Sequence, residues 1–230
     1  MNKTPKVTII MSIYNNEKTV ENAINSILNQ TYTNLEVLLL DDKSTDDSLE
    51  IIKNFAINNP HVKIIQNKRN LGLTRSLNKL IKNSTSDYIA RHDADDESHP
   101  HRIQLQMTKM LDGNLDFVST RAVSVDGKRN IPRLIFYFPY KYILKYKNPF
   151  IHGTLLVKKE MLKKVNFYDV SYYYSQDYKL MIDMLLMKAK YKVINKPLYK
   201  LNMTNNISTK FKEEQKEYAD MAKRYLREMK

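Results

Sequence analysis

The sequence predicts an α/β protein with a doubly wound sheet in its N-terminal half. Apolar runs rich in β-branched residues recur over residues 1–100, as expected for parallel strands buried on both faces. Between them lie segments whose apolar residues fall at helical spacing. Strands that alternate with helices are typical of a parallel sheet covered by helices. With no internal repeat or low-complexity linker, we expect a single domain spanning residues 1–230.

The elements of the N-terminal half follow one another in a regular order. Residues 44–47 carry side chains that commonly cap helices, directly before the second predicted helix. Strands are predicted at residues 7–13, 35–40, 62–66 and 88–91, and helices at residues 17–29, 49–57 and 73–83.

The C-terminal half has a less regular pattern, which predicts an elaboration of the same domain. Residues 128–147 are dense in Lys, Arg, Tyr and Phe and contain no acidic residue. The C-terminal segment carries both signs of charge in near balance, which favours packing or a homodimer over electrostatic anchoring. Helices are predicted at residues 102–111, 177–188 and 211–229, and strands at residues 117–124 and 155–158.

Composition excludes some chemistry. The 230 residues are 42% hydrophobic and 27% charged, which is ordinary for a globular protein. The absence of cysteine excludes disulfides, thiolate metal sites and a cysteine nucleophile. No run approaches the roughly 18 apolar residues of a membrane span, and the N-terminus leads into a strand without a signal peptide. We therefore expect a cytoplasmic protein.

The net charge of +13 leaves nucleic acid, an anionic membrane and a negatively charged small substrate open as partners. The basic and aromatic stretch 128–147 has similar alternatives. It suits peripheral contact with an anionic membrane at the inner face of the cell membrane. It also suits phosphate and base contacts with nucleic acid, or an amphipathic cover of the sheet.

Polar side chains follow three of the predicted strands. Ser12 and Tyr14 end the first strand, Asp42 follows the second, and the acidic turn 93–96 follows the fourth. Because such loops converge on one edge of a parallel sheet, we expect these side chains to form one site. A tyrosine ring can stack on a base, and a carboxylate can accept hydrogen bonds from a base or a ribose.

The acidic turn, Asp93-Ala94-Asp95-Asp96, gathers three carboxylates in four residues. Taken alone it suits a solvated turn as well as a site. Carboxylate oxygens are ligands for Mg²⁺ or Mn²⁺ carried in with a phosphorylated substrate. Neither glycine-rich phosphate-binding motif is present, so a metal, helped by a cation such as Arg75, has to neutralise a diphosphate.

Together these motifs resemble the inverting family 2 glycosyltransferases of the GT-A fold. The resemblance covers roughly residues 6–200 and implies a Rossmann-like mixed sheet flanked by helices. It divides the domain into a nucleotide-binding half (1–100), an acceptor and catalytic half (101–205) and a C-terminal helix (206–230). The segments that carry it are VTIIMSIYNNEKTVENAINSILNQTYTNLEVLLLDDKSTDDS, NLGLTRSLN, YIARHDADD and SQDYKLMI.

The resemblance implies roles for residues of the nucleotide-binding half. Ser12 and Tyr14 match positions that contact the base and the ribose. Asp42 matches the residue that hydrogen-bonds the pyrimidine ring. Arg75 matches a basic residue near the nucleotide and its diphosphate.

The resemblance also implies a metal and a catalytic base. Asp93 and Asp95 are the ends of the family's DXD motif, with Asp95 the direct ligand of Mn²⁺ or Mg²⁺ and Asp93 a partner of the ribose or the metal. Asp177 aligns with the catalytic base, and Gln176 replaces the glutamate often found before it. His152 lies in a segment that approaches the donor site in relatives, so His152 and Gln176 are candidate donor or acceptor contacts.

These roles imply an inverting single displacement. The metal offsets charge on the departing nucleoside diphosphate, while Asp177 takes the proton of the attacking acceptor hydroxyl. The predicted function is transfer of a hexosyl or N-acetylhexosaminyl group from a nucleotide sugar, expected to be UDP-linked, to a glycan or lipid-linked acceptor in surface polysaccharide synthesis. Relatives often continue Tyr199 with an arginine and a histidine. If this region contributes a diphosphate or metal contact, Lys200 substitutes for the arginine, whereas the histidine has no replacement.

Two alternatives from other classes remain. A nucleotidyltransferase shares a similar sheet, but its glycine-rich activation loop is absent. A basic nucleic-acid-binding protein would suit the charge, but acids at the strand ends would repel phosphates unless they held a metal. This second point argues against nucleic acid as a partner.

Overall fold

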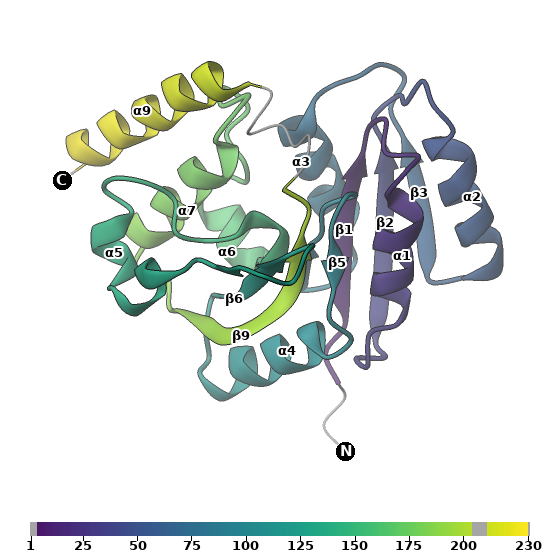
Figure 1. The fold of residues 1–230 in the computed structure, drawn as a ribbon, viewed down its shortest axis with the longest axis horizontal. Helices are drawn as coiled ribbons and strands as arrows, with labels where there is room; N and C mark the ends of the chain where they lie inside the picture. Colours follow the sequence, from purple (N-terminus) through teal and green to yellow (C-terminus); the bar gives the residue numbers. More distant parts are fainter. Residues whose placement is uncertain (1–3, 204–210, 230) are drawn as a thin grey trace.

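The computed structural model describes residues 4–203 and 211–229 of the chain (Figure 1). In these residues nine strands join one sheet in the order β3-β2-β1-β4-β8-β6-β9-β5, with β7 paired to β6. The strands are β1 (Val7–Ile13), β2 (Leu35–Asp41), β3 (Val62–Gln66), β4 (Tyr88–Arg91), β5 (Glu97–Ser98), β6 (Phe117–Ser124), β7 (Asn130–Ile131), β8 (Leu156–Lys158) and β9 (Tyr191–Leu201). The α-helices are α1 (Val20–Leu28), α2 (Ser48–Asn58), α3 (Leu73–Asn83), α4 (Arg102–Asp112), α5 (Tyr140–Ile143), α6 (Lys159–Lys164), α7 (Gln176–Leu186) and α9 (Lys212–Glu228), and the 3₁₀ helices are η1 (Leu134–Tyr137) and η2 (His152–Thr154).

The N-terminal half is the predicted doubly wound sheet. β3, β2, β1 and β4 are parallel neighbours. Successive side chains of β1 point to opposite faces, so Ile9 packs in the core shared with α1, α2 and α4, whereas Ile10 packs in the core shared with α3, α6 and α7. Burial on both faces explains why these strands appear as uninterrupted apolar runs.

The C-terminal half makes the sheet mixed, as the resemblance implied. β8 runs antiparallel to β4 and to β6, whereas β6 and β9 are parallel. The long strand β9 has many polar and exposed residues and no clear alternation of apolar and polar residues. Its strand conformation is recognised by its pairing with β6. In Figure 1 it crosses the C-terminal half beneath α7.

The predicted C-terminal helix is present as α9. Its buried residues Ala222 and Leu226 pack in the same core as α7. The predicted C-terminal segment begins at residue 206, and its first residues, 206–210, lie outside the described residues. Among the described helices, none combines the length and the apolar character that crossing a membrane requires.

Candidate active site

The carboxyl ends of β2, β1 and β4 lie side by side, as the sequence predicts. The amide of Asp42 donates to the carbonyl of Ile13 at 2.8 Å, and the amide of His92 donates to the carbonyl of Ile10 at 3.0 Å. Ser12 is half-buried at this edge, and the side chain of Tyr14 is 47% exposed. Their contacts with a base and a ribose stay predictions.

Asp42 fixes the loop that leads into α3. Its Oδ1 accepts hydrogen bonds from the side-chain amide of Asn67 at 2.7 Å and the backbone amide of Leu71 at 2.8 Å. Its Oδ2 accepts from the backbone amide of Gly72 at 2.8 Å. The buried carboxylate therefore anchors this loop, and its contact with a pyrimidine stays a prediction.

Arg75 lies in the first turn of α3, and its side chain is exposed. It lines a pocket of about 340 Å³ together with Asn78, Lys79, Lys82 and Val170. The pocket is therefore basic and suits an anion, but the predicted contact of Arg75 with a diphosphate stays a prediction.

Asp93 is held in place by two buried residues, Arg91 and Tyr199. Nη2 of the buried Arg91 pairs with Oδ1 of Asp93 at 2.5 Å. The backbone amide of Asp93 donates to the hydroxyl of Tyr199, which is also buried, at 2.9 Å. The remaining side-chain exposure of Asp93 is 30%, so the carboxylate is fixed yet reachable.

The other two acids of the turn, Asp95 and Asp96, bind a proton more tightly than a free carboxylate does. Burial and the charge of Asp93 raise the pKa of Asp95 to about 6. Burial and the charges of Asp93 and Asp95 raise the pKa of Asp96 to about 8. Oδ1 of Asp96 accepts from the backbone amide of Asn202 at 2.7 Å, which ties the turn to the end of β9 and gives Asp96 a structural role.

The donor set fits a hard divalent cation. Within the described residues, no group of three or more acidic or histidine side chains forms a complete metal cage. A cage is not what Mg²⁺ usually requires, because it binds through one or two carboxylates together with substrate phosphates and water. Asp95 and Asp93 supply such carboxylates, and a cation beside them would offset the burial and the repulsion that raise the pKa of Asp95.

Asp177 lies in the first turn of α7, beside the buried Gln176. Its Oδ2 accepts a hydrogen bond from the side-chain amide of Asn148 at 2.7 Å. Burial raises the pKa of Asp177, and the charge of Asp93 adds to the rise, so the two carboxylates share one region. A carboxylate with raised proton affinity and a fixed orientation suits a general base.

His152 is a neutral histidine in η2. Its Nε2 lies 2.7 Å from the hydroxyl of Tyr168, within hydrogen-bond distance. Burial, reinforced by the charge of Arg91, lowers the pKa of His152 well below its ordinary value. The charges of Arg91, Asp177 and Asp93 all act on Tyr168, so the His152–Tyr168 pair lies in the same region as the acidic turn and the candidate base.

Gly153 and Arg102 complete the site, and neither was predicted from the sequence. A Cβ on Gly153 would lie 2.5 Å from the hydroxyl of Tyr199 and 2.8 Å from Oδ2 of Asp93, so only glycine allows this approach. The buried guanidinium of Arg102 donates to the carbonyls of Arg91 and Gly153 at 3.2 and 3.1 Å. The sequence offers one hint of the role of Gly153: the chain has only four glycines, and one of them directly follows His152.

Lys200 binds a surface acid. Its Nζ pairs with Oε2 of Glu97 at 3.1 Å, across the β5–β9 ladder. The lysine therefore has a protein partner on the surface, and its contact with a diphosphate stays a prediction.

Comparison with known sequences identifies the family. The model of glycosyl transferase family 2 matches residues 8–166. The putative glycosyltransferase EpsE of Bacillus subtilis (strain 168) is 38% identical over 175 residues, which cover 73% of this chain and 62% of EpsE. The β-1,3-glucosyltransferase WfgD of Escherichia coli is 27% identical over 211 residues, covering 90% of this chain and 81% of WfgD. The chain thus spans less than two thirds of EpsE.

Comparison with solved structures identifies the fold. S. aureus TarS 1–349 in complex with UDP-GlcNAc superposes with a TM-score of 0.78 and 20% identity, covering 94% of this chain and 65% of TarS 1–349. The mannosyltransferase PcManGT from Pyrobaculum calidifontis, in complex with GDP-Man and Mn²⁺, superposes with a TM-score of 0.77 and 18% identity, covering 96% of this chain and 64% of that protein. The chain therefore belongs to glycosyl transferase family 2 and has the GT-A fold.

Proposed function

We propose that the chain transfers a sugar, with inversion, from a UDP-linked donor to a hydroxyl of a glycan or a lipid-linked acceptor. The environment of Asp177 is the observation that carries the proposal. Asn148 fixes its carboxylate, burial raises its pKa, and the charge of Asp93 acts on it. A base and an acidic turn in one region are what a single displacement at a nucleotide sugar requires.

The donor side of the proposal depends on the acidic turn and the neighbouring strand ends. Asp95 and Asp93 would hold Mn²⁺ or Mg²⁺, which offsets the negative charge of the leaving diphosphate. Arg91 and Tyr199 keep Asp93 in place for this task. Tyr14, exposed at the end of β1, is the proposed platform for the base, and Ser12 the proposed ribose contact.

The acceptor side depends on the N-terminus of α7. In the proposed step, Asp177 accepts the proton of the acceptor hydroxyl while that oxygen attacks the anomeric carbon. The carbon–oxygen bond to the diphosphate breaks on the opposite face, which inverts the configuration. His152, neutral because of its burial, is a proposed polar contact for the donor or the acceptor.

The relatives support the class of donor and acceptor. TarS was solved with UDP and with UDP-GlcNAc, whereas PcManGT was solved with GDP-Man. WfgD is named for UDP-Glc and for α-D-GlcNAc-diphosphoundecaprenol. We favour a UDP-linked hexose or N-acetylhexosamine and an acceptor of the surface-polysaccharide type.

A thermal-shift experiment tests the proposal and its alternatives. UDP or a UDP-sugar should raise the melting temperature in the presence of Mn²⁺, and Asp95→Ala should abolish the rise. Asp112→Ala, which removes an exposed acid at the end of α4, is the matched control and should retain it. Equal stabilisation by DNA without metal would favour a nucleic-acid-binding protein. Release of pyrophosphate from UTP and a sugar phosphate would favour a nucleotidyltransferase.

A further inference from the structure

Residues 133–147 expose an unusual number of large apolar side chains. Scattered exposed apolar residues are normal, but a group of them in one segment marks an interaction surface. Five large apolar or aromatic side chains of this segment are more than half exposed: Leu134 at 76%, Tyr137 at 70%, Phe138 at 58%, Tyr142 at 53% and Tyr146 at 74%.

Cations surround these side chains, and acids are absent from the segment. Residues 127–159 contain no aspartate or glutamate. The ammonium groups of Lys141 and Lys145 lie 5.0 and 5.7 Å from the ring centre of Tyr142, so charge and aromatic surface are intermixed. The exposed basic residues here are Arg133, Lys141, Lys145 and Lys147. We call the exposed side chains of residues 133–147 the cationic-aromatic surface.

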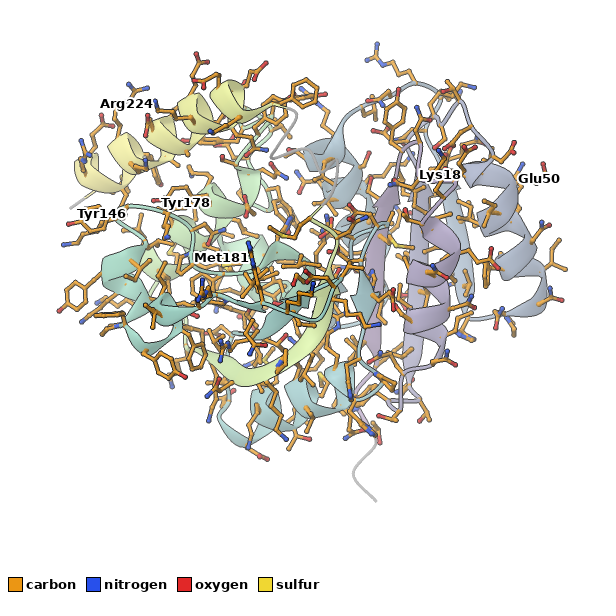
Figure 2. The ribbon with its side chains drawn as sticks, viewed as in Figure 1. Lys18, Glu50, Tyr146, Tyr178, Met181 and Arg224 are labelled. Atoms are coloured by element: carbon orange, nitrogen blue, oxygen red, sulfur yellow. The ribbon has the colours of Figure 1, made fainter. Side chains whose placement is uncertain are left out.

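The cationic-aromatic surface is held in place from beneath. Tyr140 and Leu144, four residues apart in the turn of α5, are buried in the main core. Tyr142 and Tyr146 have the same spacing on the outer side. Figure 2 shows Tyr146 at the outer edge of the molecule. Packing therefore fixes the inner side chains and leaves the outer ones projecting from a supported turn.

We propose that the cationic-aromatic surface binds an anionic lipid bilayer. Leu134 and Phe138 carry no polar side-chain atom, so they gain most by entering the boundary of the acyl chains. Tyrosine hydroxyls suit the headgroup layer, and lysine and arginine are attracted by lipid phosphates. A glycan would use the aromatic rings and the cations, but it gives no role to an exposed leucine.

The cationic-aromatic surface is joined directly to the candidate base. Asn148, the residue after Lys147, donates to Asp177, and the hydroxyl of Tyr178 donates to the carbonyl of Leu144 at 2.5 Å. A bilayer bound to this surface would therefore lie close to the start of α7, where a lipid-linked acceptor would meet Asp177. This link to catalysis rests on the proposed function, whereas bilayer binding does not.

Vesicle flotation of the full chain, without donor or acceptor, tests the binding. We expect the chain to float with vesicles of equimolar phosphatidylcholine and phosphatidylglycerol, and not with phosphatidylcholine alone. Each basic residue near such a surface contributes roughly fivefold in affinity, so Lys141→Gln, Lys145→Gln and Lys147→Gln combined should weaken binding on the order of a hundredfold. The matched control removes three exposed lysines of α2, α4 and α6: Lys53→Gln, Lys109→Gln and Lys163→Gln.

Equal losses of vesicle affinity in the two triple variants would overturn the proposal, because binding would then depend on the net charge of the chain and not on this surface. Absence of flotation at low salt would also overturn it. A monomer–dimer equilibrium that Leu134→Ser abolishes, without vesicle binding, would assign the surface to a second copy of the chain. Retention on an anionic polysaccharide without vesicle binding would assign it to a glycan.

The absence of tryptophan allows a direct measurement of insertion. Phe138→Trp places a single indole on the cationic-aromatic surface, and Ile57→Trp, at a residue 79% exposed in α2, is the control. With anionic vesicles, the emission of the Phe138→Trp variant should shift to the blue and be quenched by brominated lipid, and that of the Ile57→Trp variant should not. The same response in both variants, or in neither, would overturn the proposal.

Discussion

Replacing Asp95 with asparagine is expected to stabilise the metal-free chain while removing its response to a divalent metal. Burial and the charge of Asp93 raise the pKa of the Asp95 carboxyl from 3.8 to about 6. One pKa unit corresponds to about 1.4 kcal/mol, so ionised Asp95 destabilises the folded chain by up to about 3 kcal/mol. An asparagine carries no charge and avoids this destabilisation.

The same shift fixes the sign of the pH dependence. A raised pKa means that the folded chain binds the proton more tightly than the unfolded chain does. The free energy of unfolding should therefore fall as the pH rises from about 4 through about 6. It should fall further toward about 8, the pKa of Asp96. Asp95→Asn should remove the loss of stability between about pH 4 and 6. It should also reduce the loss toward pH 8, because the charge of Asp95 contributes to the raised pKa of Asp96.

Urea denaturation in EDTA, at low and at mildly alkaline pH, measures the effect. At about pH 8 Asp95→Asn should gain about 1–3 kcal/mol over the wild type. Asp112→Asn, at an exposed position, should stay within about 0.5 kcal/mol. Mn²⁺ should stabilise the wild type by mass action and leave Asp95→Asn unchanged. An Asp95→Asn variant no more stable than the wild type in EDTA would refute the reasoning, because burial and the charge of Asp93 would then not disfavour the ionised carboxylate.

Three other substitutions address separate parts of the site. Asp177→Asn should retain UDP-sugar binding in a thermal shift while transfer, measured as UDP release, falls by about 10²–10⁴-fold; loss of both would show that the base lies elsewhere. Gly153→Ala should lower stability by roughly 1–3 kcal/mol and weaken metal-dependent donor binding, because the new Cβ meets Tyr199 and Asp93; an unchanged melting temperature would contradict that contact. Asp42→Ala removes the acceptor of three hydrogen bonds and should speed amide hydrogen exchange in the 67–72 loop, and unchanged exchange there would contradict its anchoring role.

The sequence predicted the elements of the N-terminal half because each of them has a strong local signature. β1 and β2 are buried on both faces, which leaves a run of apolar residues that no loop would show. The helices α1 and α3 carry their buried residues at helical spacing. The polar residues after these strands then follow from topology, since parallel neighbours end at one edge.

The residues that support the acidic turn could not be predicted in this way. Gly153 and Tyr199 contact Asp93 across sixty and more positions of sequence, and no local pattern encodes such a contact. β9, which carries Tyr199, is rich in lysine and lacks clear alternation. The ion pair of Lys200 with Glu97 likewise depends on the β5–β9 pairing, which places the two residues opposite each other.

Two buried cations explain how the fold keeps an acidic turn in place without neutralising it. Arg91 pairs with Asp93, and Arg102 lies beneath both, with its guanidinium carbon 5.3 Å from the ring centre of Tyr199. Burial lowers the pKa of Arg102 to about 10, and the charges of Asp93 and Asp96 oppose that shift.

The distribution of partners then gives each acid a separate task. Asp93 is paired with Arg91, and Asp96 is bonded to the amide of Asn202. In the described part of the chain, no lysine or arginine forms an ion pair with Asp95. Asp96 is largely protonated below its pKa of about 8, so above about pH 6 the carboxylate that is charged without a paired cation is that of Asp95. Burial and the charge of Asp93 disfavour the ionised form of Asp95, and a bound cation would offset both effects, which is the property that suits Asp95 to bind one.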